Sequence, residues 1–372
     1  RLPEGFARDL MNLHPIGGKL KLRPGSEKAL SLTNARFAYP YNDGFLVVDG
    51  TNLLDVDQSL AATVIGTVPG AGTCAFTTMN GVVYASVGDE VFSVVNGQVR
   101  PWGLPTPQGV SSDVAQSKRK VSVTFTNDFG LESGASPAVP LGSTVTVPQP
   151  PAGTVANIFA SAVDGDEMYF QFAVASAGTY DVVGTSEQSR VLGTQYLTQP
   201  PPAERLVDYQ SMILGAAGNI VFHTSPLQPH HVDTMENFVF YPAPVTSLAA
   251  GNAGVYVGAD KLYLLTFRES GPSQQVVSGY PPMAGGMYMM EGGGVVAMTK
   301  KGLLVERSDD RGGFAMAPVT EQAYTVVDHE AAALGEVDFE GEKLVVSSVK
   351  DRKSTGNGLS ASDFFETEVV RP

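Results

Sequence analysis

One pattern recurs along this chain and limits what it can fold into. A short apolar run ends at a turn of Gly, Asn or Asp, a second apolar run follows, and a polar turn leads to a third. Apolar runs bounded by such turns are typical of strands in antiparallel hairpins. Outside one interruption the copies follow one another at about 35–45 residues. The six copies occupy residues 35–56, 74–94, 211–222, 247–265, 287–305 and 336–346.

These repeats predict the architecture of the main body. A single three-stranded meander cannot bury both of its faces, so neighbouring copies must cover one another. Small sheets packed around a common axis bury both faces of each sheet, and a repeat of about 35–45 residues is typical of such sheets. The sequence therefore predicts an all-β chain built on a β-propeller of about six blades, with five or seven as open alternatives. A β-sandwich with the same turn chemistry is a further alternative. Helical periodicity is nearly absent, and the best helix candidate lies near Thr320–Ala333.

The repeat is interrupted between two proline-rich seams, at residues 101–107 and 200–202. Between them we expect about six or seven strands in roughly 90 residues, which is typical of an immunoglobulin- or fibronectin-like β-sandwich. The expected domains are an N-terminal arm or closing strand (1–25), a first propeller part (26–109), an inserted β-sandwich (110–198) and a second propeller part (199–372).

The N-terminal arm is apolar at Leu10, Leu13 and Leu20, although it precedes the first repeat. We expect it to close the ring or to reach a neighbouring subunit, because a ring-shaped fold needs its ends sealed. The C-terminal run Phe364–Val370 is its expected strand partner.

Three stretches, in order, resemble one family. Asn12–Gly25 resembles the N-L-x-P … G-x-L-x-x-R-P-G signature of bacteriophage virion propeller proteins. Val123–Pro137 resembles the V-T-F-x-N-x-F-G-x-E-S-x-x-S-P stretch of the fibronectin type III-like domain inserted in such proteins. The run from Pro201 to His230 resembles the P-P … P-H segment that follows this insert. The resemblance extends from about Phe6 to Leu265.

The resemblance implies a structural component of a phage particle, in the tail or the head–tail connector. It implies a ring-shaped homo-oligomer around the DNA path, with six copies as one option, that docks other tail or connector proteins. DNA would be passing cargo only. The location would be the virion, assembled in the cytoplasm of the bacterial host. The alternative function is a receptor- or glycan-binding adhesin of a phage tail. The least supported function is that of a glycosidase whose catalytic carboxylates, such as Asp55 and Asp338, would line the central channel of the propeller.

Composition adds limits. The chain has 38 Asp and Glu against 24 Lys and Arg, a net charge of −14, which argues against a protein that grips nucleic acid phosphates. Its single cysteine, Cys74, excludes a disulfide within the chain and is expected as a small buried hydrophobe. No apolar run is long enough for a membrane span. We recognise no signal peptide, and the start at Arg1 leads us to expect preceding residues.

The motifs favour no chemistry. His223, His230, His231 and Asp233 lie within eleven residues but match no zinc spacing, which leaves a loop or subunit contact as the favoured interpretation over a metal. The Asp-rich turns at 55–57 and 164–167 lack the ligands of a calcium loop, so turn chemistry is favoured over calcium. There is no G-x-S-x-G elbow. We therefore expect no enzyme, no catalytic, cofactor or metal site, and no small-molecule substrate.

Basic and histidine side chains are the candidates for assembly contacts. Lys118–Lys120 is the one basic cluster, and we interpret it as a solvated strand end or as a contact with an acidic neighbour. The candidate interface residues are Arg8, His14, Arg23, Lys118, Arg119, Lys120, His230 and His231.

Overall fold

Strands follow one another along the described part of the chain. A computed structural model describes residues 13–16, 19–22, 30–184, 187, 189–268, 271–308, 313–318, 329–339, 342–351 and 366–370. Within these ranges every regular element is a strand, which confirms the expected all-β class. None of the described elements is a helix that could cross a membrane. The helix expected near Thr320–Ala333 is wrong where it can be compared, because β32 (His329–Phe339) is a strand, and residues 319–328 lie outside the described residues.

Four sheets are antiparallel meanders of four strands each. The first two contain β3 (Ala35–Tyr41), β4 (Gly44–Asp49), β5 (Asn52–Val56) and β6 (Ala62–Thr67), then β7 (Cys74–Met79), β8 (Val82–Val87), β9 (Glu90–Val95) and β10 (Gln98–Pro101). The third contains β19 (Arg205–Tyr209), β20 (Met212–Ala217), β21 (Ile220–His223) and β23 (Phe238–Phe240). The fourth contains β24 (Ser247–Ala250), β25 (Val255–Gly258), β26 (Leu262–Arg268) and β27 (Gly271–Ser278).

The hairpin turns follow from the sequence. Asn80 and Gly81 connect β7 to β8 with φ of +52° and +76°, and Asn96 and Gly97 connect β9 to β10 with +50° and +72°. Two-residue turns with both φ values positive match the twist of antiparallel strands, and Asn-Gly adopts them at low cost. Four of the six predicted repeats are found as separate four-stranded sheets, and the last two lie in the larger C-terminal sheet.

The C-terminal region forms a larger sheet. β28 (Pro282–Met289), β29 (Val295–Thr299), β30 (Gly302–Ser308) and β31 (Phe314–Pro318) form a fifth meander, and one parallel bridge, Ala284 to Ala331, joins it to β32. β32 then pairs with β33 (Glu342–Asp351), and β33 with β34 (Glu366–Val370).

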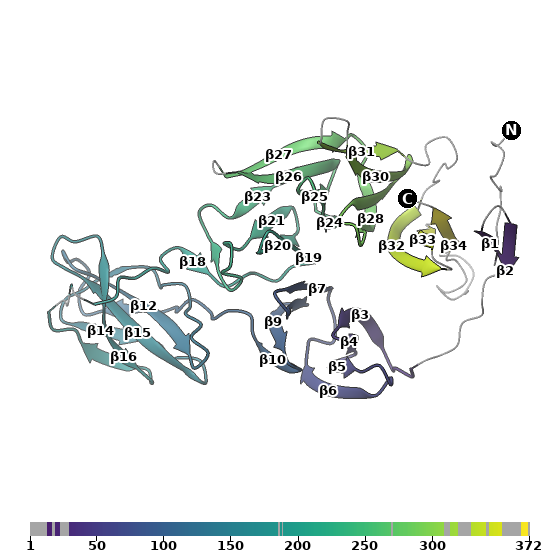
Figure 1. The fold of residues 1–372 in the computed structure, drawn as a ribbon. Coiled ribbons are helices and arrows are strands. Elements are labelled where there is room, and N and C mark those ends of the chain that lie inside the picture. The colour runs from purple at the N-terminus through teal and green to yellow at the C-terminus, as the bar shows by residue number, and fades with distance from the viewer. Residues whose placement is uncertain are drawn as a thin grey trace.

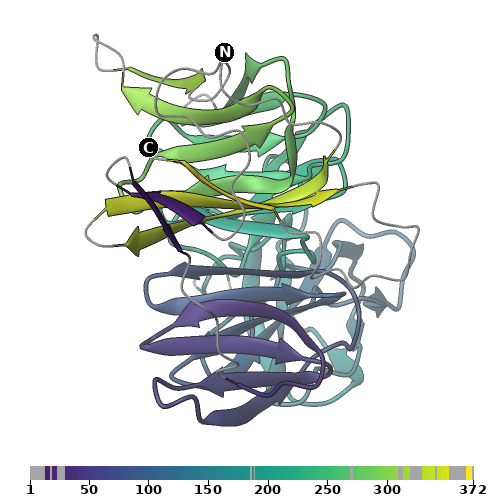
Figure 2. The same cartoon turned by 90° about the vertical axis from the view of Figure 1, so that its right-hand side faces the viewer.

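The two chain ends are paired differently from the expectation. The C-terminal strand β34 pairs with β33, whereas the N-terminal β1 (Leu13–Ile16) and β2 (Lys19–Leu22) form a hairpin with each other. The expected strand pairing between the ends is therefore not the one seen. The hairpin lies beside β34 in both views (Figures 1 and 2).

Successive sheets pack against one another. The first strands of successive sheets contact in chain order, β3 with β7, β7 with β19, β19 with β24 and β24 with β28, and β28 then pairs with β32 within the C-terminal sheet. The sheets follow an arc in Figure 1. Each hydrophobic cluster between them draws on two consecutive sheets, as in the cluster that joins Val48 to Phe76 and the one that joins Leu214 to Val255. Cys74 packs, half-buried, against the first of these clusters, close to the buried hydrophobe that was expected.

Residues between Gly103 and Gln199 form a separate body, the insert, to the left of the arc in Figure 1. One sheet has the order β13-β12-β15-β16 and the other β11-β14-β17, and their facing side chains share one core that includes Val123, Ile158 and Val145. Leu104 already belongs to this core, six residues ahead of the expected start at 110. The strands are β11 (Ser111–Ser112), β12 (Lys120–Asn127), β13 (Val139–Pro140), β14 (Thr144–Val147), β15 (Thr154–Ser161), β16 (Met168–Val174) and β17 (Gly178–Asp181).

Candidate functional site

The basic cluster at the start of β12 is paired within the insert. Lys118 Nζ lies 2.9 Å from Asp164 Oδ2, and Lys120 Nζ lies 3.3 Å from Asp166 Oδ1. Arg119 donates to the backbone carbonyls of Ser161 and Gly184. All four side chains of the two ion pairs are at least half exposed, so each pair contributes little stability. The cluster is thus a strand end that the Asp-rich turn 164–166 neutralises.

The histidines are divided between two places. His223 lies on β21 with its ring 5.0 Å from that of Phe267. The rings of His230 and His231 lie 4.3 Å apart, and His231 Nε2 is 2.6 Å from the backbone carbonyl oxygen of Glu132 in the insert. Burial, with the neighbouring His231, lowers the pKa of His230 to about 4, and burial also lowers the pKa of His231. The His230–His231 pair is therefore neutral at neutral pH.

The remaining interface candidates give no side-chain contacts. His14 lies in β1, whose side chains are not described, and Arg8 and Arg23 lie outside the described residues. No group of three or more His, Cys, Asp or Glu in the described part of the chain is arranged to hold a metal ion.

The histidine pair belongs to the junction between insert and main body. Trp102 is 1% exposed, donates from Nε1 to the carbonyl of Pro229 at 2.7 Å, and packs against Tyr84. The Arg100 guanidinium lies 4.5 Å from the centre of the Phe129 ring of the insert. The returning strand β18 (Leu197–Thr198) pairs with β22 (Val232–Asp233) of the main body. Apolar, polar and backbone contacts thus all fix the insert to the main body.

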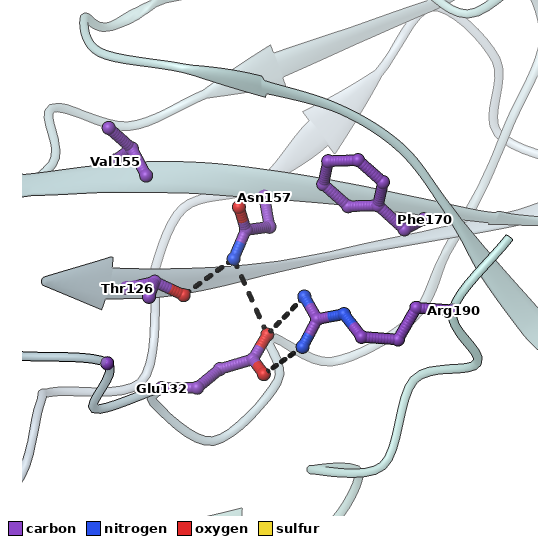
Figure 3. A pocket seen from close by; sticks show the side chains of 7 residues that line it. Thr126, Glu132, Val155, Asn157, Phe170 and Arg190 are labelled. Atoms are coloured by element: carbon purple, nitrogen blue, oxygen red, sulfur yellow. Dashed lines mark hydrogen bonds and ion pairs between the residues drawn. The ribbon is translucent and has the colours of Figure 1, made fainter.

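A depression of about 300 Å³ opens on the insert (Figure 3). β12 supplies Thr126, β15 supplies Val155 and Asn157, and β16 supplies Phe170. Alternate residues of a strand point to opposite faces, so Val155 and Asn157 share the face opposite the insert core. Segments beyond β12 and β17 complete the wall with Glu132 and Arg190.

Glu132 and Arg190 form a two-point ion pair. Arg190 Nη2 donates to Glu132 Oε1 at 3.1 Å, and its Nη1 donates to Oε2. Glu132 Oε1 also accepts from the Thr124 hydroxyl at 2.6 Å and from Asn157 Nδ2 at 3.5 Å. The side chain of Glu132 is only 16% exposed, while that of Arg190 is 53% exposed. Charge-assisted bonds of this two-point form are strong and directional, so the pair fixes the wall of the depression.

Local sequence patterns carry only weak signals of this site. Glu132 stands in the V-T-F-x-N-x-F-G-x-E-S stretch, whereas Arg190 is 58 residues further on and no local pattern connects the two. Trp102 was visible only as the single Trp, in a proline-rich seam.

In the acidic stretch 55–57, the Asp57 carboxylate accepts hydrogen bonds from the residues that follow it. Asp57 accepts from the Ser59 hydroxyl at 2.7 Å and from the Ala61 N–H at 2.9 Å, and these bonds lower the pKa of its carboxyl. An Asp that accepts from residues two and four positions later closes a turn. The turn interpretation thus holds for Asp57, whereas Asp55 and Val56 are the last residues of strand β5.

Comparison with known proteins adds little. No protein-family model and no curated protein sequence matches this chain. Among solved structures, the chain is similar to the extracellular domain of a hybrid two component system from B. thetaiotaomicron, with 10% identity and a TM-score of 0.32 over 84% of this chain and 37% of that one. The N-terminal domain of Nup159 gives 13% identity and a TM-score of 0.30 over 85% and 73% of the two chains.

A third similar structure is PorZ, a surface component of the type-IX secretion system of Porphyromonas gingivalis, with 11% identity and a TM-score of 0.24 over 88% and 48% of the chains. This chain spans little more than a third of the length of the first of the three proteins. TM-scores of this size carry no argument about fold or function.

Proposed function

We propose that the main body is a β-propeller of six blades, that the insert is an immunoglobulin- or fibronectin-like β-sandwich, and that the chain is a structural component of a bacteriophage particle. The observation that carries the proposal is the ordered packing of the first strands from β3 to β28, with a hydrophobic cluster between each pair of consecutive sheets, and the continuation of the last sheet into β32 and β33. Small antiparallel sheets packed in this manner are the building units of propellers.

The virion role rests on the resemblance of Asn12–Gly25 and Val123–Pro137 to phage propeller proteins. The rigid attachment of the insert through Trp102 and the β18–β22 pair supports a part that holds position in an assembly. Copies of the chain would form a closed ring around the DNA path, since a repeated head-to-tail contact closes when its rotation divides a full turn. The net charge of −14 suits a wall past which DNA slides.

The test has two parts. Mass photometry and negative-stain electron microscopy of the purified chain, over a range of concentrations, should show a ring of fixed copy number. Mass spectrometry of purified phage particles should find the chain at the same copy number. A chain that stays monomeric at every concentration and is missing from particles would overturn the proposal.

Variants in the basic cluster Lys118–Lys120 test the proposed ring more directly. If Lys118 and Lys120 dock an acidic neighbour, a Lys118→Glu and Lys120→Glu double variant should stop ring formation without unfolding the insert, because the native ion pairs there are exposed and weak. Lys261→Glu, at an exposed turn of the fourth sheet, is the matched control. Equal ring formation by both variants would exclude this cluster as the interface.

A further inference from the structure

We propose that the depression on the insert binds a neutral sugar residue. This is a recognition function in addition to the structural role, and it does not depend on that role. The site is assembled from side chains that are already fixed, and the groups that remain free have the chemistry of a carbohydrate site.

The depression is preorganised by bonds beneath its surface. Asn157 is 6% exposed and donates from Nδ2 to the Thr126 hydroxyl at 2.6 Å and to the Thr124 hydroxyl at 3.3 Å. Thr124 in turn donates to Glu132. A site whose side chains are held in this way loses little conformational entropy when a ligand binds.

The free hydrogen-bonding groups combine donors and an acceptor. Because the Thr126 oxygen accepts from Asn157, its own hydrogen is available to a ligand. Each Arg190 Nη carries two hydrogens and uses one on Glu132, which leaves one further hydrogen on each Nη of this half-exposed side chain. Within the described residues Glu132 Oε2 accepts only from Arg190, so it keeps a lone pair. A sugar hydroxyl both donates and accepts, and a pair of neighbouring hydroxyls fits such an array.

The charge and shape of the depression further limit the class of ligand that it can bind. The Arg190 cation is neutralised by Glu132 at contact distance, so the site offers no net charge to attract an anion. Val155 lines another part of the wall, and the Phe170 ring lies beside the guanidinium, as Figure 3 shows, with its centre 5.8 Å from Arg190 Cζ. The two side chains provide apolar surface for the C–H faces of a pyranose ring. A volume of about 300 Å³ is at the lower end for small-ligand pockets. These features select a single neutral sugar residue, such as the end of a surface glycan, over a phosphate or a carboxylate.

The test uses saturation-transfer NMR on the full chain with a panel of glucose, galactose, mannose, N-acetylglucosamine and N-acetylgalactosamine, and with sialic acid and inorganic phosphate as anionic probes. We expect at least one neutral sugar to bind with a Kd of about 1 mM, equivalent to about −4 kcal/mol, and the anions to bind more weakly. Failure of every neutral sugar, or preference for an anion, would overturn the proposal.

Two variants test whether the sugar binds in this depression. Thr126→Val removes the hydroxyl with little change in shape, although Asn157 also loses one of its acceptors, and Arg190→Lys removes the planar donors but keeps the charge. Each should weaken sugar binding at least tenfold. Thr146→Val is the matched control, because Thr146 is also a strand residue whose hydroxyl bonds a neighbouring strand, 3.0 Å from Thr179 Oγ1, but in the other sheet of the insert.

Circular dichroism and the unfolding midpoint show whether the variants fold. If Arg190→Lys unfolds the insert, Thr126→Val alone decides the outcome. Sugar binding that is unchanged in Thr126→Val, or equally reduced in Thr146→Val, would place the ligand elsewhere and refute the site. The copy number of the chain in phage particles is measured independently, so failure here is distinguishable from failure of the structural role.

Discussion

Glu306 is a buried carboxylate that connects two sheets. It lies on β30, is 5% exposed, and accepts from the backbone N–H groups of Asn252 and Ala253 in the preceding sheet, at 3.1 and 2.9 Å. The Tyr256 hydroxyl also donates to it at 3.0 Å, and burial together with this carboxylate raises the pKa of Tyr256. A buried charge is tolerated when hydrogen bonds satisfy its oxygens, so Glu306 fixes the spacing of the two sheets.

Replacement of Glu306 by Gln should destabilise the main body by about 3 kcal/mol, because an amide NH₂ would face N–H donors and leave buried groups unsatisfied. Glu90→Gln, at an exposed strand position, should change stability by no more than about 0.5 kcal/mol. Urea unfolding measures both. Equal stability of the two variants would show that the Glu306 bonds do not hold the sheets together.

At the scale of elements, the junction between insert and main body depends on Trp102. Its indole is buried and its N–H is bonded to Pro229, so a smaller side chain leaves a cavity and an unpaired carbonyl. Trp102→Phe should cost about 1–2 kcal/mol and Trp102→Ala about 3–5 kcal/mol. Thermal unfolding measures the loss, and Phe129→Ala, at an exposed position of the same junction, is the control. An Ala variant as stable as the parent chain would mean that the junction does not depend on this indole.

The histidine pair makes the junction sensitive to acid. The pKa values of His230 and His231 are lowered in the folded chain, to about 4 for His230, whereas an unfolded histidine has a pKa of about 6.5. As pH falls below about 6.5 the unfolded state takes up protons first, so this stability is complete above that pH and is lost progressively down to about 4.

We therefore expect the thermal midpoint to fall by several degrees between pH 7.5 and 4.5. A His230→Gln and His231→Gln double variant should show a smaller fall. Some dependence should remain, because burial also lowers the pKa of His223. An identical pH profile for parent and double variant would contradict the assignment.

Local sequence patterns predicted the strands well but predicted the long-range contacts between them poorly. Asn-Gly turns and apolar runs determine hairpins such as β7–β8, because both features act over a few residues. β14 and β15 of the insert are short apolar runs of the same local kind. The Glu132–Arg190 pair depends on chain segments that meet only after folding, and so does the pairing of β34 with β33.

At the scale of the whole molecule, main body and insert have separate hydrophobic cores. Ile158 and Val145 belong to the insert cluster, and Phe222 and Trp102 to a cluster of the main body. Replacement of residues 104–198 by a two-glycine linker should therefore leave a main body that unfolds cooperatively, with a lower midpoint because the junction contacts are lost. Circular dichroism and thermal unfolding test this. Loss of β-structure throughout the shortened chain would show that the main body needs the insert to fold.

The close approach of Gly103 to Gln199 has a consequence beyond stability. A Cβ atom added to Gly103 would lie 2.9 Å from the Gln199 Cβ, so the chain leaves the main body and returns to it at almost the same point. The main body therefore has a single attachment point for an inserted domain. A domain whose two ends lie equally close together is therefore expected to replace the insert with little change to the sheets of the main body.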